Sequence, residues 1–200
     1  MRYNHQKKPQ TKEISDEFLL KARKERWVLN KYFNSLDREN NYIYSTVTPE
    51  DGKDSYDGTL VIHSKSDNKS TRFILEVKIR EVHYPELLLE KKKCKQLLKK
   101  ANEFEADVLY ITTTPKATYI FNITKLEDKL KWVKQYHWQS TVDKTYGKIL
   151  KDVTFLNTLD GSDHSEHLNI FNITTDDIEI QQKEEEKEIE NQKPRQGFQL

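Results

Sequence analysis

Asp57, Glu76 and Lys78 are the residues whose types and spacing could do chemistry. Glu76 and Lys78 lie two positions apart in the strand-like stretch FILEVKIRE (73–81), so their side chains share one face. Asp57 begins the preceding strand-like run, DGTLVIHS. If these two strands pair, the carboxylates of Asp57 and Glu76 converge at one end of a sheet. Two close carboxylates do not both ionise without a cation beside them.

A hard divalent ion would meet that need. Mg²⁺ and Mn²⁺ take oxygen ligands, which the carboxylates of Asp57 and Glu76 supply. An ammonium such as that of Lys78, beside the ion, could orient or help deprotonate an attacking water. It could equally stabilise charge on a phosphorane-like transition state. The pattern therefore points to metal-assisted hydrolysis.

The first element that would position these residues is a helix from Asp16 to about Leu36. Ser15 offers an N-cap and is followed by two acids in the first turn. Glu25 falls within the apolar stripe of this helix, and an acid on a buried face is costly unless it is paired or metal-linked. We therefore take Glu25 as a candidate site residue. The stripe consists of Phe18, Ala22, Leu29, Tyr32 and Leu36.

Three strand-like runs follow this helix. The links between them are rich in turn-forming residues and too short for crossover connections, which predicts a β-meander. In the third run, apolar residues alternate with Glu76 and Lys78, so one face would hold the sheet's core. The runs are YIYSTVT (42–48), DGTLVIHS (57–64) and TRFILEVKIRE (71–81).

A second helix is predicted over residues 86–106, after Pro85, with an apolar stripe opposite many lysines. Strands at 107–114 and 117–123 come next, so the helix would be a crossover to a neighbouring strand. The fold class is thus α/β, a mixed central β-sheet flanked by helices in the order α-β-β-β-α-β-β. Beyond this core we expect a helix at 125–138, a β element within KTYGKILKDVTFLNTL and a strand at 167–173.

The composition divides the chain into three parts. Residues 1–14 are polar and basic, and we expect disorder there. Residues 15–175 would form a single domain. Residues 176–200 hold 8 acidic and 4 basic residues and form a charged tail, expected to be disordered or a solvated helix. Since the whole chain has a net charge of +1, the remaining body is mildly basic, which is compatible with a nucleic-acid partner.

Several classes of protein are excluded or disfavoured. No apolar run approaches the length of a membrane helix, and the N-terminus lacks the apolar segment of a secretory signal, so we expect a cytoplasmic protein without membrane association. Cys94 is the single cysteine, which excludes an internal disulfide. With 5 glycines and no glycine-rich phosphate loop, hydrolysis of nucleoside triphosphates is unsupported. The six histidines lack the spacing of a zinc site.

The pair Asp57-Gly58, followed by Glu76-Val77-Lys78, resembles the Asp…Glu-x-Lys signature of the PD-(D/E)XK, or restriction-endonuclease-like, nuclease superfamily. The order of predicted elements over residues 15–123 resembles that superfamily's core as well. The resemblance implies Mg²⁺-dependent hydrolysis of a phosphodiester, with Asp57 and Glu76 as metal ligands and Lys78 at the water. Many members carry a glutamate on the first helix, a position that Glu25 matches. Tyr56 stands where the signature has proline.

The crossover helix of such nucleases often contributes another polar residue. Lys93 is our first candidate and Glu90 the second, while Gln96 is also available. The lysines of this helix, Lys91, Lys93 and Lys95 among them, could contact phosphates or simply form a solvated face.

The resulting expectation is a metal-dependent nuclease using Mg²⁺ or Mn²⁺, acting on nucleic acid, with DNA favoured. A bacterial cell or phage-infected host would suit the Lys- and Asn-rich composition. A homodimer stays open, since many relatives dimerise so that each protomer cuts one strand. One alternative is a catalytically inactive module of the same fold that binds nucleic acid or a protein. Another is an interaction protein that recruits a partner through its acidic tail.

Each site residue also has an ordinary structural explanation. Glu76 and Lys78 could form a cross-strand ion pair on a solvent-facing strand. Asp57 could be a turn residue that bonds its own backbone. Glu25 could be an ion-paired helix acid. Trp132, Tyr136 and Trp138 could stack on bases or pack as part of a covering helix.

Overall fold

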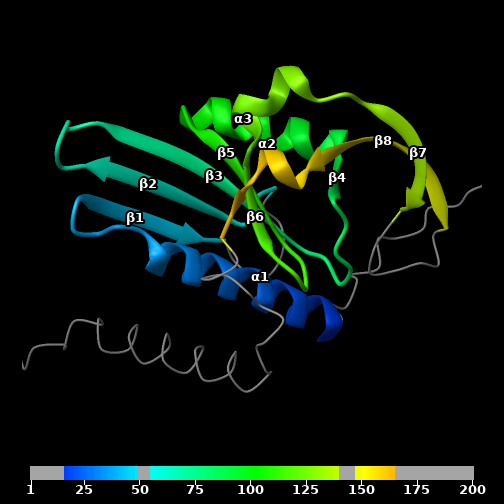
Figure 1. Ribbon diagram of the computed structural model, residues 1–200, viewed down its shortest axis with the longest axis horizontal. Helices are drawn as coiled ribbons and strands as arrows, with labels where there is room; N and C mark the ends of the chain where they lie inside the picture. The colour runs from blue at the N-terminus through cyan, green and yellow to red at the C-terminus, as the bar shows by residue number, and fades with distance from the viewer. Residues whose placement is uncertain (1–15, 49–54, 140–146, 165–200) are drawn as a thin grey trace, which may run out of the picture.

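The computed structural model describes residues 16–48, 55–139 and 147–164 (Figure 1). The main elements, in chain order, are α1 (Asp16–Ser35), β1 (Asn41–Val47), β2 (Gly58–Ser64), β3 (Ser70–Ile79), β4 (Glu86–Glu90), α2 (Lys91–Phe104), β5 (Asp107–Thr113), β6 (Thr118–Asn122), α3 (Ile123–Leu126), β7 (Val133–Trp138), β8 (Lys148–Asn157) and β9 (Ser162–Asp163). Short 3-10 turns follow α3, at Glu127–Lys129, and β8, at Thr158–Asp160.

The larger sheet has six strands in the order β1-β2-β3-β5-β6-β9. Strands β1, β2 and β3 form an antiparallel meander, as the short links predicted. β3 and β5 pair in parallel, and α2 lies on the connection between them, so the predicted crossover is confirmed. β5 and β6 are antiparallel. This mixed sheet with flanking helices confirms the predicted α/β class, with strand β4 added between β3 and α2.

Two apolar cores lie on opposite faces of this sheet. α1 covers one face, where Val28 and Leu29 pack with Leu75 and Val77 of β3. α2 covers the other face, where Leu97 packs with Ile74 of β3. The helices lie on either side of the sheet in Figure 1, with α1 below it and α2 above it. Residues 74 and 76 of β3 therefore point toward α2, which puts Glu76 inside a helix-covered face.

The α1 stripe is largely as predicted. Leu29 and Tyr32 are buried, and Leu36 packs against the same core. The side chain of Phe18 lies outside what the structure describes. On β3, the alternating apolar residues from Phe73 to Ile79 share one face, as predicted, and this face packs against α1.

The predicted helix over residues 86–106 is wrong in its first five residues. Glu86–Glu90 is strand β4, and only Lys91–Phe104 is helical. β4 pairs antiparallel with β8, which buries Leu87 and Leu89 on one face of the strand. The run ELLLE suits either structure locally, and its partner strand begins about 60 residues later in the chain. Pairing with the distant strand β8, and not the local sequence, therefore makes residues 86–90 a strand.

The predicted helix over residues 125–138 is also wrong. Only a short helical stretch, Ile123–Leu126 with the 3-10 turn after it, exists there, and Val133–Trp138 is strand β7. β7 pairs antiparallel with β8, so β4, β8 and β7 form a second, three-stranded sheet. The predicted β element in this region is confirmed as β8.

Other sequence expectations concern residues outside the described ranges. These are the disorder of residues 1–14, the strand at 167–173 and the charged tail at 176–200. The division of the chain into one domain, 15–175, with two tails therefore stays a prediction. Among the helices that the structure describes, none is long and apolar enough to cross a membrane.

Gly58 sits where β1, β2 and α1 approach closely. A Cβ atom at this position would lie 2.8 Å from the main-chain oxygen of Thr46 and 3.2 Å from Cδ1 of Leu29. Gly58 is also the first residue of β2 and pairs with Leu75 of β3. The absence of a side chain thus lets α1 pack against the strand end that carries Asp57.

We expect Gly58→Ala to destabilise the protein by about 1–3 kcal/mol, because the added methyl overpacks this contact. Urea unfolding followed by circular dichroism would measure the change. Ser45→Ala, at an exposed position of the adjacent strand, is the control and should be nearly neutral. An unfolding free energy of Gly58→Ala equal to that of the wild type would contradict this packing account.

Candidate active site

The site begins where β2 and β3 separate. The N–H of Asp57 still donates to the carbonyl of Leu75, at 2.8 Å. One step further along β3, the N–H of Val77 donates instead to Oδ2 of the Asp57 side chain, at 2.7 Å. The carboxylate thus takes the place of a strand carbonyl, which holds it against β3 beside residue 76. Asp57 is therefore more than a turn residue bonded to its own backbone.

Glu76 is fully buried, with 0% of its surface exposed. Its Oε1 lies 2.5 Å from Nζ of Lys78, and its Oε2 lies 2.7 Å from Nζ of Lys93. Neither oxygen makes a contact with hydrogen-bond geometry to any described residue. The charge of Glu76 is thus balanced mainly by two ammonium groups. A solvent-facing ion pair is excluded.

Lys93 connects three parts of the site. It is the third residue of α2, and its Nζ donates to the carbonyl oxygen of Ser55 at 3.0 Å while it pairs with Glu76. Ser55 lies two residues before Asp57, so the lysine ties the segment that carries Asp57 to the crossover helix. Of the crossover-helix candidates, our first choice, Lys93, is the one that contacts Glu76.

Lys78 lies among acids from three elements. Its Nζ is 3.9 Å from Oε1 of Glu25 as well as close to Glu76, and it donates to the carbonyl of Val77 at 2.9 Å. Burial lowers the pKa of Lys78, but the charges of Glu76, Glu25 and Asp57 outweigh it and raise the pKa above its ordinary value. Lys78 is therefore a fixed cation at neutral pH.

Glu25 and Asp57 are carboxyl groups with raised pKa values. Burial raises the pKa of Glu25 to about 7, against the lowering effect of Lys78. Burial and the charge of Glu76 raise the pKa of Asp57 to about 6, against the lowering effects of Lys78 and of the Val77 N–H. Oε1 of Glu25 is buried and makes no hydrogen bond to any described residue. Both groups would ionise more readily beside an added cation.

The donor set suits a hard divalent cation in type. Asp57 and Glu76 supply carboxylate oxygens, and both Glu76 oxygens lack hydrogen bonds within the described chain. In number the set is small, since no group of three or more His, Cys, Asp or Glu side chains among the described residues is arranged to hold a metal. An ion would therefore rely on these two carboxylates together with main-chain or water oxygens, and would compete with Lys78 and Lys93 for Glu76.

The remaining candidates contact other groups, although Glu90 lines the same cleft as Glu76 and Lys78. Glu90, at the end of β4, pairs with Lys151 at 2.7 Å. Nζ of Lys91 lies 5.6 Å from the ring centre of Trp132. Lys95 and Gln96 are exposed on α2. Within the described ranges, none of these four shows a contact with Asp57, Glu76 or Lys78.

Sequence reasoning missed Tyr110 and Arg80. Tyr110 of β5 lies opposite Glu76 in the parallel register and is buried, which raises its pKa. Arg80, just after β3, lies 3.4 Å from the Tyr110 hydroxyl and also donates to the carbonyl of Leu88. The predicted β3–β5 pairing was the available signal, but its register could not be read from the sequence.

A cleft of about 940 Å³ opens beside these residues. Glu76, Lys78 and Lys93 line one side, and the first half of α1 contributes Lys21 and Lys24. The strand β7 reaches the same cleft with His137 and Trp138 as further lining residues. The cluster is therefore buried in part but open to a ligand on one side.

Two solved structures are similar to this chain. One is Hjc, a Holliday junction resolvase from the archaeal hyperthermophile Archaeoglobus fulgidus, at 16% identity and a TM-score of 0.44, covering 72% of this chain and 93% of that one. The other is D212, a nuclease from a fusselovirus, at 18% identity and a TM-score of 0.38, covering 72% and 86%. No protein-family model matches the chain, and no curated protein does.

The raised pKa of Glu25 predicts a pH dependence of stability. Because the folded state binds this proton more tightly than the unfolded state, the contribution of Glu25 is complete below pH 4.5 and is lost as the pH rises to about 7. At roughly 1.4 kcal/mol per pKa unit, the loss of unfolding free energy is at most about 3–4 kcal/mol. The unfolding free energy of Glu25→Gln should fall less than that of the wild type between pH 4.5 and about 7. Urea unfolding in EDTA would measure both.

Glu39→Gln, at an exposed position just beyond α1, is the control for this measurement and should follow the wild type. Some decline should persist in Glu25→Gln, since Asp57 also has a raised pKa. Identical slopes for Glu25→Gln and wild type would contradict the burial of an ionisable Glu25.

Proposed function

We propose that this protein is a metal-dependent nuclease that hydrolyses phosphodiester bonds, with DNA as the preferred substrate. The observation that carries the proposal is the placement of the Asp57 carboxylate against β3 beside Glu76 and Lys78, which line an open cleft. The resemblance of these residues to the Asp…Glu-x-Lys signature supports the same reaction.

In this proposal Asp57 and Glu76 hold the metal ion, which supplies Lewis-acid activation when bound. The Lys78 ammonium, held beside Glu76 and Glu25, donates hydrogen bonds and stabilises negative charge on the phosphate oxygens. Glu25 fixes the position of the Lys78 ammonium through their ion pair. Lys93 holds the Asp57 segment in place and shares the charge of Glu76.

A basic lining of the cleft supports nucleic acid as the substrate class. Lys21 and Lys24 on α1 line the same cleft as Lys78 and Lys93. Phosphate groups passing them would gain charge contacts that weaken with salt. Lys91 and Lys95 are not among the described lining of the cleft, so the proposed phosphate contacts do not need them.

Glu76→Gln and Lys78→Met should each lower cleavage at least about 100-fold, because each removes a charge that faces the reacting phosphate or its metal. The assay is hydrolysis of labelled single- and double-stranded DNA and RNA with Mg²⁺ or Mn²⁺. Glu86→Gln and Lys92→Met, at exposed positions of β4 and α2, are the matched controls. Wild-type rates in either site variant, with folding checked by circular dichroism, would refute the assignment.

Metal binding can be tested apart from cleavage. Mn²⁺ at about 100 times its Kd should stabilise the wild type by about 2.7 kcal/mol, seen as a higher Tm. Asp57→Asn should lose this gain, whereas Asp128→Asn, an exposed control, should keep it. A gain that persists in Asp57→Asn would place the ion elsewhere.

A second candidate function is a non-catalytic module that binds nucleic acid. The observation that favours it is the balance of charge around Glu76, since Lys78 and Lys93 neutralise the carboxylate without any ion. This candidate would be supported by DNA binding in a protein whose Tm does not respond to Mg²⁺ or Mn²⁺.

A further inference from the structure

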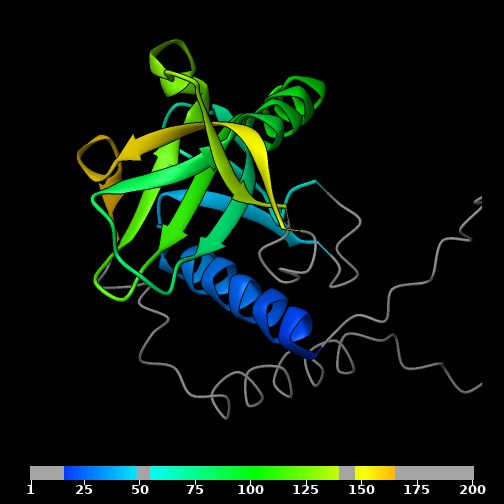
Figure 2. The same cartoon turned by 90° about the vertical axis from the view of Figure 1, so that its right-hand side faces the viewer.

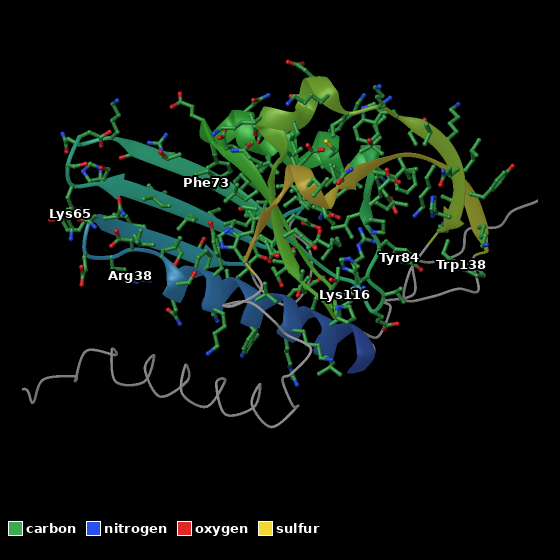
Figure 3. All side chains as sticks on the ribbon, viewed as in Figure 1. Arg38, Lys65, Phe73, Tyr84, Lys116 and Trp138 are labelled. Carbon is green, nitrogen blue, oxygen red and sulfur yellow. The ribbon has the colours of Figure 1, made fainter. Side chains whose placement is uncertain are left out.

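The wall of the cleft formed by β7 carries an accessible aromatic ring. Trp138, the last residue of β7, is 39% exposed and lines the cleft that contains Glu76 and Lys78. Tyr84, on the connection between β3 and β4, is 57% exposed and lines the same cleft. Figure 3 labels both residues, on the side of the molecule occupied by β7 and β8.

Strand pairing holds Trp138 in place. It pairs with Lys148 of β8, whose Nζ lies 5.3 Å from the centre of the Trp138 ring. A cation at this distance is attracted to the ring. Figure 2 shows β7 and β8 in front of the larger sheet when the molecule is viewed from this side. The ring is thus attached to a paired strand instead of a free loop.

The rings of Trp138 and Tyr84 are exposed and do not belong to either apolar core. Trp132, in contrast, packs against the core under α2. Tyr136, two residues before Trp138, is 69% exposed but is not part of the described lining of the cleft. Exposed aromatic rings are costly to keep in water, and two of them line the cleft that holds the candidate site.

The charge of the cleft suits a polyanion. Five of its lining residues are basic and three are acidic, and one of the acids is the Glu76 that the lysines already balance. Its volume of about 940 Å³ is at the upper end of the range for small-molecule sites. A cleft of this size suits a short unpaired stretch of nucleic acid.

We propose that Trp138, assisted by Tyr84, stacks on unpaired bases of a nucleic-acid strand whose phosphates pass Lys78 and Glu76. The proposal rests on the proposed nuclease function and specifies its substrate as single-stranded or locally unpaired nucleic acid. Base stacking on aromatic side chains is strong and tolerant of sequence. Bases within an intact duplex are already stacked on one another, so the rings would add little to duplex binding.

The test is the binding of fluorescein-labelled oligodeoxynucleotides, single-stranded or as a blunt duplex, followed by anisotropy in EDTA so that no cleavage occurs. Trp138→Ala should weaken single-strand binding about 5-fold or more and leave duplex binding unchanged. Trp138→Phe should recover much of the affinity, because it keeps an aromatic ring. Tyr84→Ala should cause a smaller loss of the same kind.

Tyr136→Ala is the matched control, an exposed aromatic residue on the same strand but outside the described lining of the cleft. It should bind both oligonucleotides as the wild type does. Wild-type single-strand affinity in Trp138→Ala would overturn the proposal. So would an equal loss for single strand and duplex, which would indicate a general structural effect.

The outcomes separate this proposal from the nuclease function. If the wild type cleaves nothing but Trp138→Ala selectively loses single-strand binding, the nuclease proposal fails and the stacking role stands. If cleavage is normal and Trp138→Ala binds as the wild type, the stacking role fails alone. If the wild type binds neither oligonucleotide in EDTA, the stacking role fails, and the cleavage assay with Mg²⁺ or Mn²⁺ decides the nuclease function separately.

Discussion

The hydrogen bond from the Val77 N–H to the Asp57 carboxylate is the contact on which the site depends. At this point β2 has ended its pairing with β3, and a backbone N–H in the middle of the sheet would otherwise lose its partner. The side chain of Asp57 supplies the missing acceptor. The hydrogen bond that completes the pairing of β3 therefore also places the Asp57 carboxylate beside Glu76.

The second constraint is the burial of charge. A fully buried carboxylate is very costly unless it is compensated, and Glu76 has two ammonium groups within 2.7 Å. Hydrophobic residues would give a core at least as stable in many such cases. Stability alone therefore does not explain why five charged side chains gather at one place. They are Glu25, Asp57, Glu76, Lys78 and Lys93. Their concentration beside an open cleft is better explained by a charged ligand.

The cleft itself is built from two sheets. The six-stranded sheet supplies the acids and Lys78, whereas the three-stranded sheet supplies β7, with His137 and Trp138. Arg80 connects the two, because it reaches from the end of β3 to the carbonyl of Leu88 on β4. The smaller sheet thus adds a second wall to the cleft, and the proposed stacking places the ligand's bases on this wall.

Local patterns in the sequence determined much of this protein. The period of two in β3 and the period near 3.6 in α1 predicted both elements, the sharing of one face by Glu76 and Lys78, and the inward place of Glu25, since these depend only on neighbouring residues. Tertiary structure alone decided that residues 86–90 and 133–138 are strands, because both pair with β8, which follows them in the chain. It alone also brought Tyr110 and Trp138 to the site, since register and the meeting of two sheets are set by distant contacts that no local pattern records.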